Sequence, residues 1–187
     1  READAINKLI IINRPITCAE LLIKKKIKRI PGEVVLSNKG CCLIRIDEKT
    51  FVIDFISSQF IQHIIQKRDW YLTAFCDNEF VRFIRQCLGF LSIKDINYLS
   101  HNIYASYLFK AINPSLLIFD AYDNVVKFPF PKKHLCKLSL AYSEYKNTAN
   151  MWITNSQSNL DYYQDHYHAN NIKIIRNGIE SSDFKNL

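Results

Sequence analysis

Glycine is scarce in this sequence, and none of the four glycines belongs to a familiar phosphate-binding or nucleophile motif. Neither GxGxxG nor GxxxxGKS/T occurs, which argues against dinucleotide binding of the usual kind and against P-loop hydrolysis. GxSxG and HExxH are also absent, so the common hydrolase signatures are missing. Any binding or catalytic site of this chain must therefore be built from residues outside these motifs.

Long hydrophobic runs and paired cysteines are lacking as well. No apolar run approaches the roughly 18 residues that span a bilayer, and the first run, Leu9 to Ile12, is too short for a signal-peptide core. We therefore expect neither insertion nor export. The six cysteines include no CxxC pair, which argues against a zinc ribbon and a disulfide scaffold. Reduced, buried thiols in the cytoplasm are the simpler interpretation.

The composition is that of a folded protein with an excess of positive charge. Apolar residues make up 48% and charged residues 23%, which excludes disorder, and 187 residues predict one domain. The net charge of +7 favours anionic partners. The densest basic stretch, Lys24 to Arg29 (KKKIKR), could meet nucleic acid, an anionic membrane or a phosphorylated substrate, or form a solvated helix face. Other positive residues are scattered, so we expect no nucleic-acid partner.

The first third of the chain predicts strands around one helix. Lys8 to Asn13 (KLIIIN) is a continuous apolar run, which predicts a strand buried on both faces in the middle of a sheet. Thr17 and Glu20 have the spacing of a capping box, and Pro31-Gly32 stops the run that follows, so a basic amphipathic helix is expected between them. Short β-rich runs separated by turn clusters predict a meander or hairpin over residues 33–56.

From Ser57 onward, helical periodicity dominates and then alternates with strands. Apolar residues share one face between Phe60 and Ile65, and again in a longer helix that starts near Asp77; we expect both faces to lie in the core. Strands then alternate with helices, which is typical of βαβ units and a parallel sheet. The expected strands are 96–100, 116–119, 151–154 and 172–175, and the expected helices are 103–112, 132–149 and 157–167. The predicted fold is α/β, a doubly wound, mostly parallel sheet with helices on both faces.

Polar side chains follow every predicted parallel strand. In an open α/β sheet, ligands bind beyond the carboxyl ends of the strands. The residues found there are Asn13, Arg14, Ser100, His101, Asn102, Asp120, Tyr122, Asp123, Asn124, Thr154, Asn155, Ser156, Arg176, Asn177 and Gly178. Such residues also serve as turns and helix caps, and for Asn155-Ser156 the two interpretations stay open.

Two of these strand ends carry chemistry-bearing side chains. Asp120, Tyr122 and Asp123 place two carboxylates and a phenol within four residues, more than one helix cap requires. His101 could act as a general base or bind a substrate hydroxyl, or it could be a hydrogen-bonded structural group. Tyr104 and Tyr122 flank the expected crevice at this edge and suit carbohydrate ligands, because tyrosines stack on sugar faces and donate a hydrogen bond.

The C-terminal half carries motifs in a recognisable order. MWITNSQSNLDYY (151–163), followed by IKIIRNGIESSDF (172–184), resembles the N-terminal domain of GT-B glycosyltransferases of the retaining, family 4 type. LLIFDAYDN (116–124) is similar to the family's strand that ends in Asp-x-His-Asp, with Asp120 and Asp123 at the two aspartates and Tyr122 in place of the histidine. Phe128 follows shortly after. An Asp-x-x-Asp motif followed by phenylalanine resembles the pattern of the subgroup that acts on bacterial surface polysaccharides. The resemblance covers about residues 95–187; residues 1–60 depart from it.

This resemblance implies a Rossmann-like fold and a second domain that binds the nucleotide-sugar. Asn177-Gly178 would lie close to the link to that domain, so we expect residues 1–187 to be one acceptor-side domain, inactive alone. No cofactor is implied, since the nucleotide-sugar is the donor substrate of the complete enzyme. Because Tyr122 replaces the histidine that approaches the donor sugar in many members, that histidine's part is not carried over to this loop.

The leading hypothesis is the N-terminal half of a bacterial, cytoplasmic glycosyltransferase at the inner face of the cell membrane. It would transfer a hexosyl group to a cell-surface glycan or a lipid-linked precursor, with Asp123 and His101 as the catalytic candidates. The acceptor would contact Asn13, Arg14, Asn102, Asp120 and Tyr122, whereas Ser156, Asn177 and Gly178 would face the interdomain cleft; no metal is expected. The alternatives are half of a nucleotide-sugar epimerase, and a stand-alone flavodoxin-like binding or regulatory domain.

Overall fold

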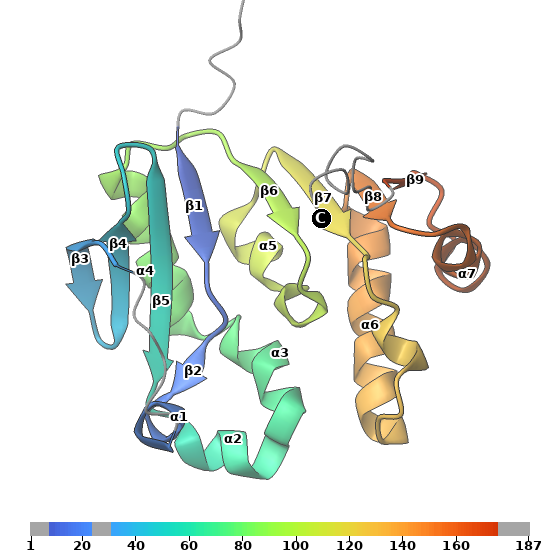
Figure 1. Ribbon diagram of the computed structural model, residues 1–187, viewed down its shortest axis with the longest axis horizontal. Helices are drawn as coiled ribbons and strands as arrows, with labels where there is room; N and C mark the ends of the chain where they lie inside the picture. Colours follow the sequence, from blue (N-terminus) through green and yellow to red (C-terminus); the bar gives the residue numbers. More distant parts are fainter. Residues whose placement is uncertain (1–7, 24–30, 176–187) are drawn as a thin grey trace, which may run out of the picture. The chain divides into compact units, whose positions relative to one another are not determined.

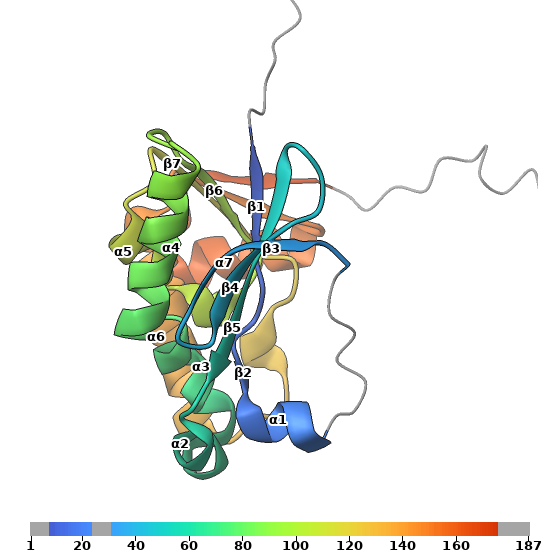
Figure 2. The same cartoon turned by 90° about the vertical axis from the view of Figure 1, so that its left-hand side faces the viewer.

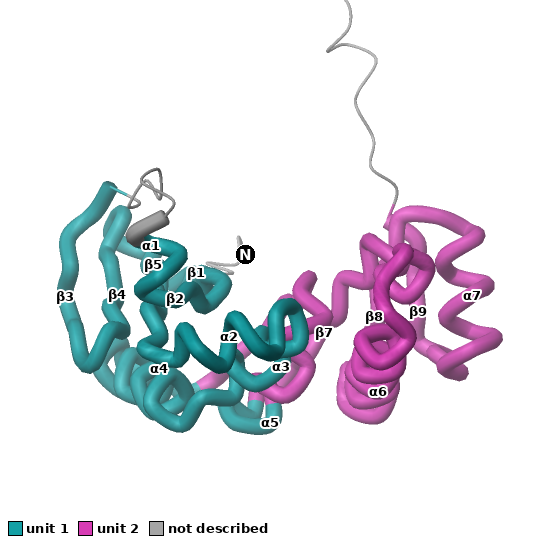
Figure 3. Tube along the Cα trace, turned by 90° about the horizontal axis from the view of Figure 1, so that it is seen from below, with its two compact units in different colours: residues 1–94, 110–113 teal, residues 95–109, 114–187 magenta. Residues whose placement is uncertain are grey.

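The computed structural model describes residues 8–23 and 31–175, and the chain divides into two compact units (Figure 3). Unit 1 comprises residues 1–94 and 110–113, and unit 2 comprises residues 95–109 and 114–187. The basic stretch Lys24 to Arg29 and the predicted cleft residues Asn177 and Gly178 lie outside the described residues. Each unit is considered by itself below.

Unit 1 contains a mixed sheet of five strands (Figure 1). The main path runs β1-β5-β4-β3, and β2 also pairs with β5. β1 and β2 run parallel to β5, whereas β3, β4 and β5 form an antiparallel meander, which confirms the prediction for residues 33–56. The strands are β1 (Leu9–Ile12), β2 (Ile16–Thr17), β3 (Glu33–Asn38), β4 (Cys41–Arg45) and β5 (Thr50–Ser57).

The position predicted for the first strand is wrong. β1 stands at the end of its sheet's order rather than in the middle, and its side chains alternate between exposed and half-buried. Leu9 and Ile11 are among the exposed apolar residues. A continuous apolar run predicts a strand but does not determine what covers its two faces.

The capping box predicted at the start of the first helix is present. The Glu20 backbone N–H donates to Thr17 Oγ1 over 3.3 Å, and the Thr17 N–H donates to Glu20 Oε2 over 3.1 Å. These two bonds satisfy donors that a helix start leaves without partners. The helix, α1 (Cys18–Ile23), is described as far as Ile23.

The turn between β3 and β4 requires its glycine. Lys39 and Gly40 both have positive φ, 43° and 81°, as a two-residue hairpin turn of the primed type demands. A Cβ at Gly40 would lie 2.4 Å from the carbonyl oxygen of Ile56. Both the backbone conformation and the lack of space therefore exclude a side chain at this position.

Two alanine substitutions should have opposite effects on stability. Gly40→Ala should lower the free energy of unfolding by more than about 1 kcal/mol, because the side chain meets both strain and a backbone clash. Gly89, in a helix and with open space where a Cβ would stand, is the matched control. Gly89→Ala should raise the free energy of unfolding by about 0.5–1 kcal/mol. Urea denaturation measures both, and a stable Gly40→Ala protein would contradict the described turn.

Four helical elements follow the meander between residues 58 and 94, and the first of them lacks the predicted burial. They are α2 (Phe60–Gln66), η1 (Lys67–Asp69), α3 (Trp70–Ala74) and α4 (Asn78–Phe90). α4 lies alongside the sheet (Figure 2), with Phe80 stacked on Phe55 at 4.8 Å, so its apolar face is in the core as predicted. α2 has no buried residue, so the prediction that its apolar face lies in the core is wrong.

Unit 2 contains a sheet of four parallel strands in the order β6-β7-β8-β9. The strands are β6 (Asn97–Ser100), β7 (Leu116–Asp120), β8 (Met151–Thr154) and β9 (Ile172–Ile174), all within one residue of the predicted bounds. The helix expected over 103–112 is instead two short elements, η2 (Ile103–Ala105) and α5 (Leu108–Ile112). The remaining helices are η3 (Val125–Lys127), α6 (Lys132–Thr148) and α7 (Gln157–Tyr167).

An aromatic cluster forms the core of unit 2. Phe119 of β7 stacks on Tyr145 of α6 with ring centroids 3.8 Å apart, and meets Trp152 of β8 edge-on at 4.9 Å. Tyr142 and Tyr163 extend the cluster from α6 to α7, and all five rings are buried. This packing fixes the strands whose carboxyl ends carry the predicted site.

The α/β class predicted from the sequence is confirmed. The strands described are hydrogen-bonded in two sheets, one mixed and one wholly parallel, and not in one continuous sheet as predicted. That residues 1–187 form one domain stays a prediction.

All six cysteines are free thiols. Burial raises the pKa of Cys41 and of Cys87 to about 12, so both remain protonated and unreactive at neutral pH. Cys18 and Cys136 are exposed, and the expectation of buried thiols is wrong for these two.

Candidate functional site

The carboxyl ends of β6 and β7 bring together most of the predicted site residues. The register pairs Ser100 with Phe119, so the residues that follow, His101 and Asp120, are neighbours at the same edge of the sheet. The charge of His101 acts on the Asp120 carboxyl, which agrees with this placement. Because all four strands of this sheet are parallel, the loops after β6, β7 and β8 meet at one edge.

The loop that follows β7 is held by its backbone. Thr154 Oγ1 donates to the carbonyl of Ala121 over 3.2 Å, and Asn159 Nδ2 donates to the carbonyl of Tyr122 over 3.2 Å. The Tyr142 hydroxyl donates to the carbonyl of Asp123 over 2.9 Å. Three successive carbonyls are therefore anchored by side chains from β8, α7 and α6. The loop is fixed without use of its own exposed side chains.

Those side chains are consequently available at the surface. Tyr122 is 46% exposed, and Asp123 is also exposed. A carboxylate accepts hydrogen bonds from two neighbouring hydroxyls, and a tyrosine ring stacks on the apolar face of a sugar. The anchored loop thus presents both groups in a defined position.

Asn124 is among the polar residues that follow the predicted strand, but the sequence analysis did not select it as a site residue. It is only 6% exposed, and neither its side-chain nitrogen nor its oxygen has a hydrogen-bond partner among the described residues. A buried amide without partners costs about 1–3 kcal/mol for each group, so such a residue requires an explanation. Its sequence position, directly after Asp123, gave a weak signal, since an asparagine in such a loop usually serves as a turn residue.

Asp120 is perturbed in the direction expected of a functional carboxyl. Burial raises its pKa above the ordinary value for aspartate, and the nearby charge of His101 offsets part of this rise. A raised pKa makes the carboxylate a better proton acceptor and shows that its charged form is destabilised in the fold.

This perturbation predicts a pH-dependent effect of Asp120→Asn. A raised pKa stabilises the fold while the carboxyl is protonated, and this stabilisation is lost as the pH rises through the pKa of the folded state. The asparagine variant should therefore be more stable than the parent at neutral pH, and the difference should vanish below about pH 3.9, the ordinary aspartate pKa. Urea denaturation across this pH range measures the difference.

Asp47 is a control of opposite sign. The backbone N–H groups of Lys49 and Thr50 donate to its carboxylate and lower its pKa, so that its stabilisation is lost as the pH falls. Asp47→Asn should therefore weaken the fold at neutral pH. An Asp120→Asn protein no more stable than its parent at neutral pH would refute the assigned perturbation.

Two further predicted residues have structural roles at this edge. The Asn102 side chain accepts from the Tyr104 N–H over 3.0 Å and caps η2. Ser156 Oγ accepts from the Asn159 N–H over 3.3 Å and caps α7. For Ser156, this is the cap that the sequence left open as one of two interpretations.

Asn13 and Arg14 belong to unit 1, whereas the other described candidates belong to unit 2. Asn13 Nδ2 donates to Asp54 Oδ1 over 2.6 Å. The Arg14 guanidinium lies 4.9 Å from the ring centroid of Tyr71 and forms an ion pair with Glu20 at 3.2 Å. Both side chains therefore already have partners within their own unit.

A tyrosine–histidine pair extends the polar edge of unit 2. The Tyr104 hydroxyl lies 3.0 Å from His134 Nε2, and His134 is buried in the first turn of α6. The Phe130 ring packs edge-on against the same imidazole at 5.1 Å. Sequence reasoning placed Tyr104 beside the crevice but did not identify His134 as its partner.

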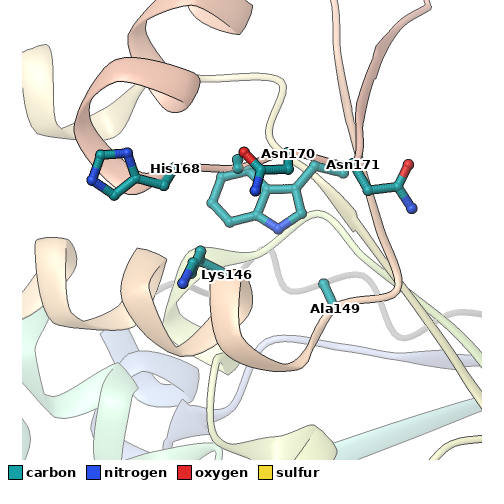
Figure 4. Close-up of a pocket in the computed structure, with 7 residues that line it drawn as sticks. Lys146, Ala149, His168, Asn170 and Asn171 are labelled. Atoms are coloured by element: carbon teal, nitrogen blue, oxygen red, sulfur yellow. The ribbon is translucent and has the colours of Figure 1, made fainter.

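A separate depression of about 210 Å³ lies at the start of β8 and β9, away from these carboxyl ends (Figure 4). Trp152 forms part of its wall, and Lys146 and His168 are the titratable residues that line it. It contains no carboxylate. The carboxylates of Asp120 and Asp123 therefore have no counterpart in this depression.

Searches for other kinds of site give negative results for the described residues. Over residues 8–23 and 31–175, no three histidine, cysteine or acidic side chains are grouped so that they could hold a metal ion. Of the helices in the described part of the chain, none combines the length and the apolar character that a membrane crossing needs. No protein-family model and no curated protein sequence matches the chain.

The edge formed by β6 and β7 is thus the best candidate site. It combines an anchored loop, two carboxylates, an imidazole and a buried amide without partners. These groups can accept a proton from a hydroxyl and hold a polyhydroxylated ligand by several hydrogen bonds.

Proposed function

We propose that this chain is the acceptor-binding half of a glycosyltransferase, which moves a sugar from a nucleotide-sugar donor to a cell-surface glycan or a lipid-linked precursor. The observation that carries the proposal is Asn124, whose buried amide lacks partners and which directly follows the exposed Tyr122 and Asp123 in the chain. A sugar hydroxyl both donates and accepts, so one hydroxyl could satisfy part of this amide once a local shift of the loop uncovers its buried polar atoms. The resemblance over residues 95–187 supports the same assignment.

The proposed roles follow from position and exposure. Asp123, exposed on the anchored loop, accepts the proton of the attacking hydroxyl, and His101 supports this transfer at the neighbouring strand end. Asp120 and Asn102 bind further hydroxyls, and Tyr122 stacks on the sugar face. The nucleotide-sugar would be held by a second domain of a complete GT-B enzyme, in which unit 2 contributes to a Rossmann-like fold.

The proposed location is the cytoplasmic face of the membrane, where lipid-linked acceptors are found. The basic stretch Lys24 to Arg29 would contribute attraction to anionic lipids of about 1 kcal/mol for each cation near the surface. Vesicle association that is insensitive to salt would count against this contribution.

Asn124→Ala tests the acceptor site directly. In the full-length enzyme, the KM for the acceptor should rise on the order of ten-fold, because a hydrogen bond to the substrate is lost. The KM for the nucleotide-sugar should not change. Steady-state transfer assays with each substrate varied in turn measure both constants.

Asn147→Ala is the matched control, since Asn147 is an exposed asparagine on α6. It should leave both KM values unchanged. Equal acceptor KM values for the parent and Asn124→Ala would remove the main support for the proposal. Sugar binding without any transfer would favour the alternative of a binding or regulatory domain.

A further inference from the structure

Helix α2 turns its apolar face outward. Phe60, Ile61, Ile64 and Ile65 are 41%, 56%, 65% and 75% exposed. At 3.6 residues per turn, these four positions lie within an arc of about 140° on one side of the helix. An amphipathic helix of a globular protein normally buries such a stripe. Here all four side chains of the stripe are exposed.

A polar side chain occupies the inward side of the same helix. The His63 ring lies 4.8 Å from the ring of Trp70 and 5.6 Å from that of Tyr71, measured between centroids. Trp70 is fully buried, so this contact fixes the orientation of α2 on unit 1. The outward direction of the isoleucines is therefore a consequence of defined packing and not of a detached helix.

The exposed charges that follow α2 directly in the chain are positive. α2 contains no acidic residue, and the exposed Lys67 and Arg68 follow it directly. Arg14 contacts Tyr71 and forms an ion pair with Glu20, so it is not counted among the cations of this face. Asp69 is half-buried. Aliphatic and aromatic side chains beside cations match the interface of an anionic bilayer.

We propose that α2 is a peripheral docking element that inserts Phe60, Ile61, Ile64 and Ile65 into the surface of an anionic lipid membrane. A protein partner fits less well, because four partly exposed side chains present far less than the roughly 800 Å² that each partner contributes to a specific interface. A bilayer requires no complementary shape and supplies the negative charge. The proposal does not depend on glycosyl transfer.

Vesicle cosedimentation of the 187-residue chain tests this proposal. Binding is expected to vesicles of phosphatidylcholine mixed with phosphatidylglycerol, and to be weaker with phosphatidylcholine alone. Ile64→Ser/Ile65→Ser should lower the partition coefficient on the order of 100-fold, because each buried isoleucine contributes about ten-fold or more. Lys67→Gln should weaken only the binding to the anionic vesicles.

Leu140→Ser is the matched control, because Leu140 is an isoleucine-sized apolar residue of α6 that is 62% exposed. It should leave binding unchanged. Circular dichroism should show the double variant folded, since both replaced side chains face solvent. Equal vesicle binding by the double variant and the parent would overturn the proposal, as would no binding by the parent. Self-association that the double variant loses, without vesicle binding, would assign the face to a second copy of the chain.

Discussion

Asp123→Ala is expected to lower kcat/KM for sugar transfer by the proposed full-length glycosyltransferase about 10³-fold, within the range typical for loss of a general base. The structure indicates that this variant removes the carboxylate without breaking the hydrogen bond that holds the loop. It is the carbonyl of Asp123, not its carboxylate, that the Tyr142 hydroxyl holds at 2.9 Å. Alanine therefore keeps the anchor of the loop and removes only the exposed acid. Transfer rates measured under subsaturating substrate give the comparison.

The control for Asp123 is another exposed carboxylate of unit 2. Asp165 lies on α7, and Asp165→Ala should leave kcat/KM within about two-fold of the parent. Thermal unfolding of the two variants should be alike. If Asp123→Ala retains full activity in a folded protein, Asp123 is not the base.

Phe119→Ala should cause the largest loss of stability, about 3–5 kcal/mol in the free energy of unfolding. Phe119 is 2% exposed, stacks on Tyr145 and contacts Trp152, so its removal leaves a cavity at the centre of the aromatic cluster. It also directly precedes Asp120 at the end of β7. The loss of packing should therefore disturb the site as well as the core. Urea denaturation monitored by tryptophan fluorescence measures the effect.

Phe90→Ala provides the comparison for a large aromatic residue outside a core. Phe90 is the last residue of α4 and is 56% exposed, so its replacement should cost less than about 1 kcal/mol. Similar losses for the two variants would contradict the described burial of Phe119.

The elements of unit 2 were largely predictable because their periodicity is strong and local. Met151–Thr154 and Gln157–Tyr167 have the predicted bounds, and Ser156 between them forms the helix cap that was one of its two open interpretations. The proximity of His101 to Asp120 also followed from the sequence, since the carboxyl ends of parallel strands meet at one edge.

Other features depend on tertiary contacts that periodicity does not encode. The spacing of Phe60, Ile61, Ile64 and Ile65 correctly defines an apolar face, but only the contact of His63 with Trp70 determines that this face points outward. Asn124 has the sequence signature of a turn residue. Its burial without partners arises from how the loop after β7 is anchored by three other elements.

The central claim is that the edge beyond β6 and β7 binds a sugar acceptor. The most direct measurement is an NMR titration of the ¹⁵N-labelled chain with hexose glycosides, with the side-chain amide signal of Asn124 assigned by its absence from Asn124→Ala. We predict that this signal shifts together with the backbone signals of Asp120, Tyr122 and Asp123. Saturating glycosides that leave these signals unmoved, or move only those around Trp152 and His168, would contradict the claim.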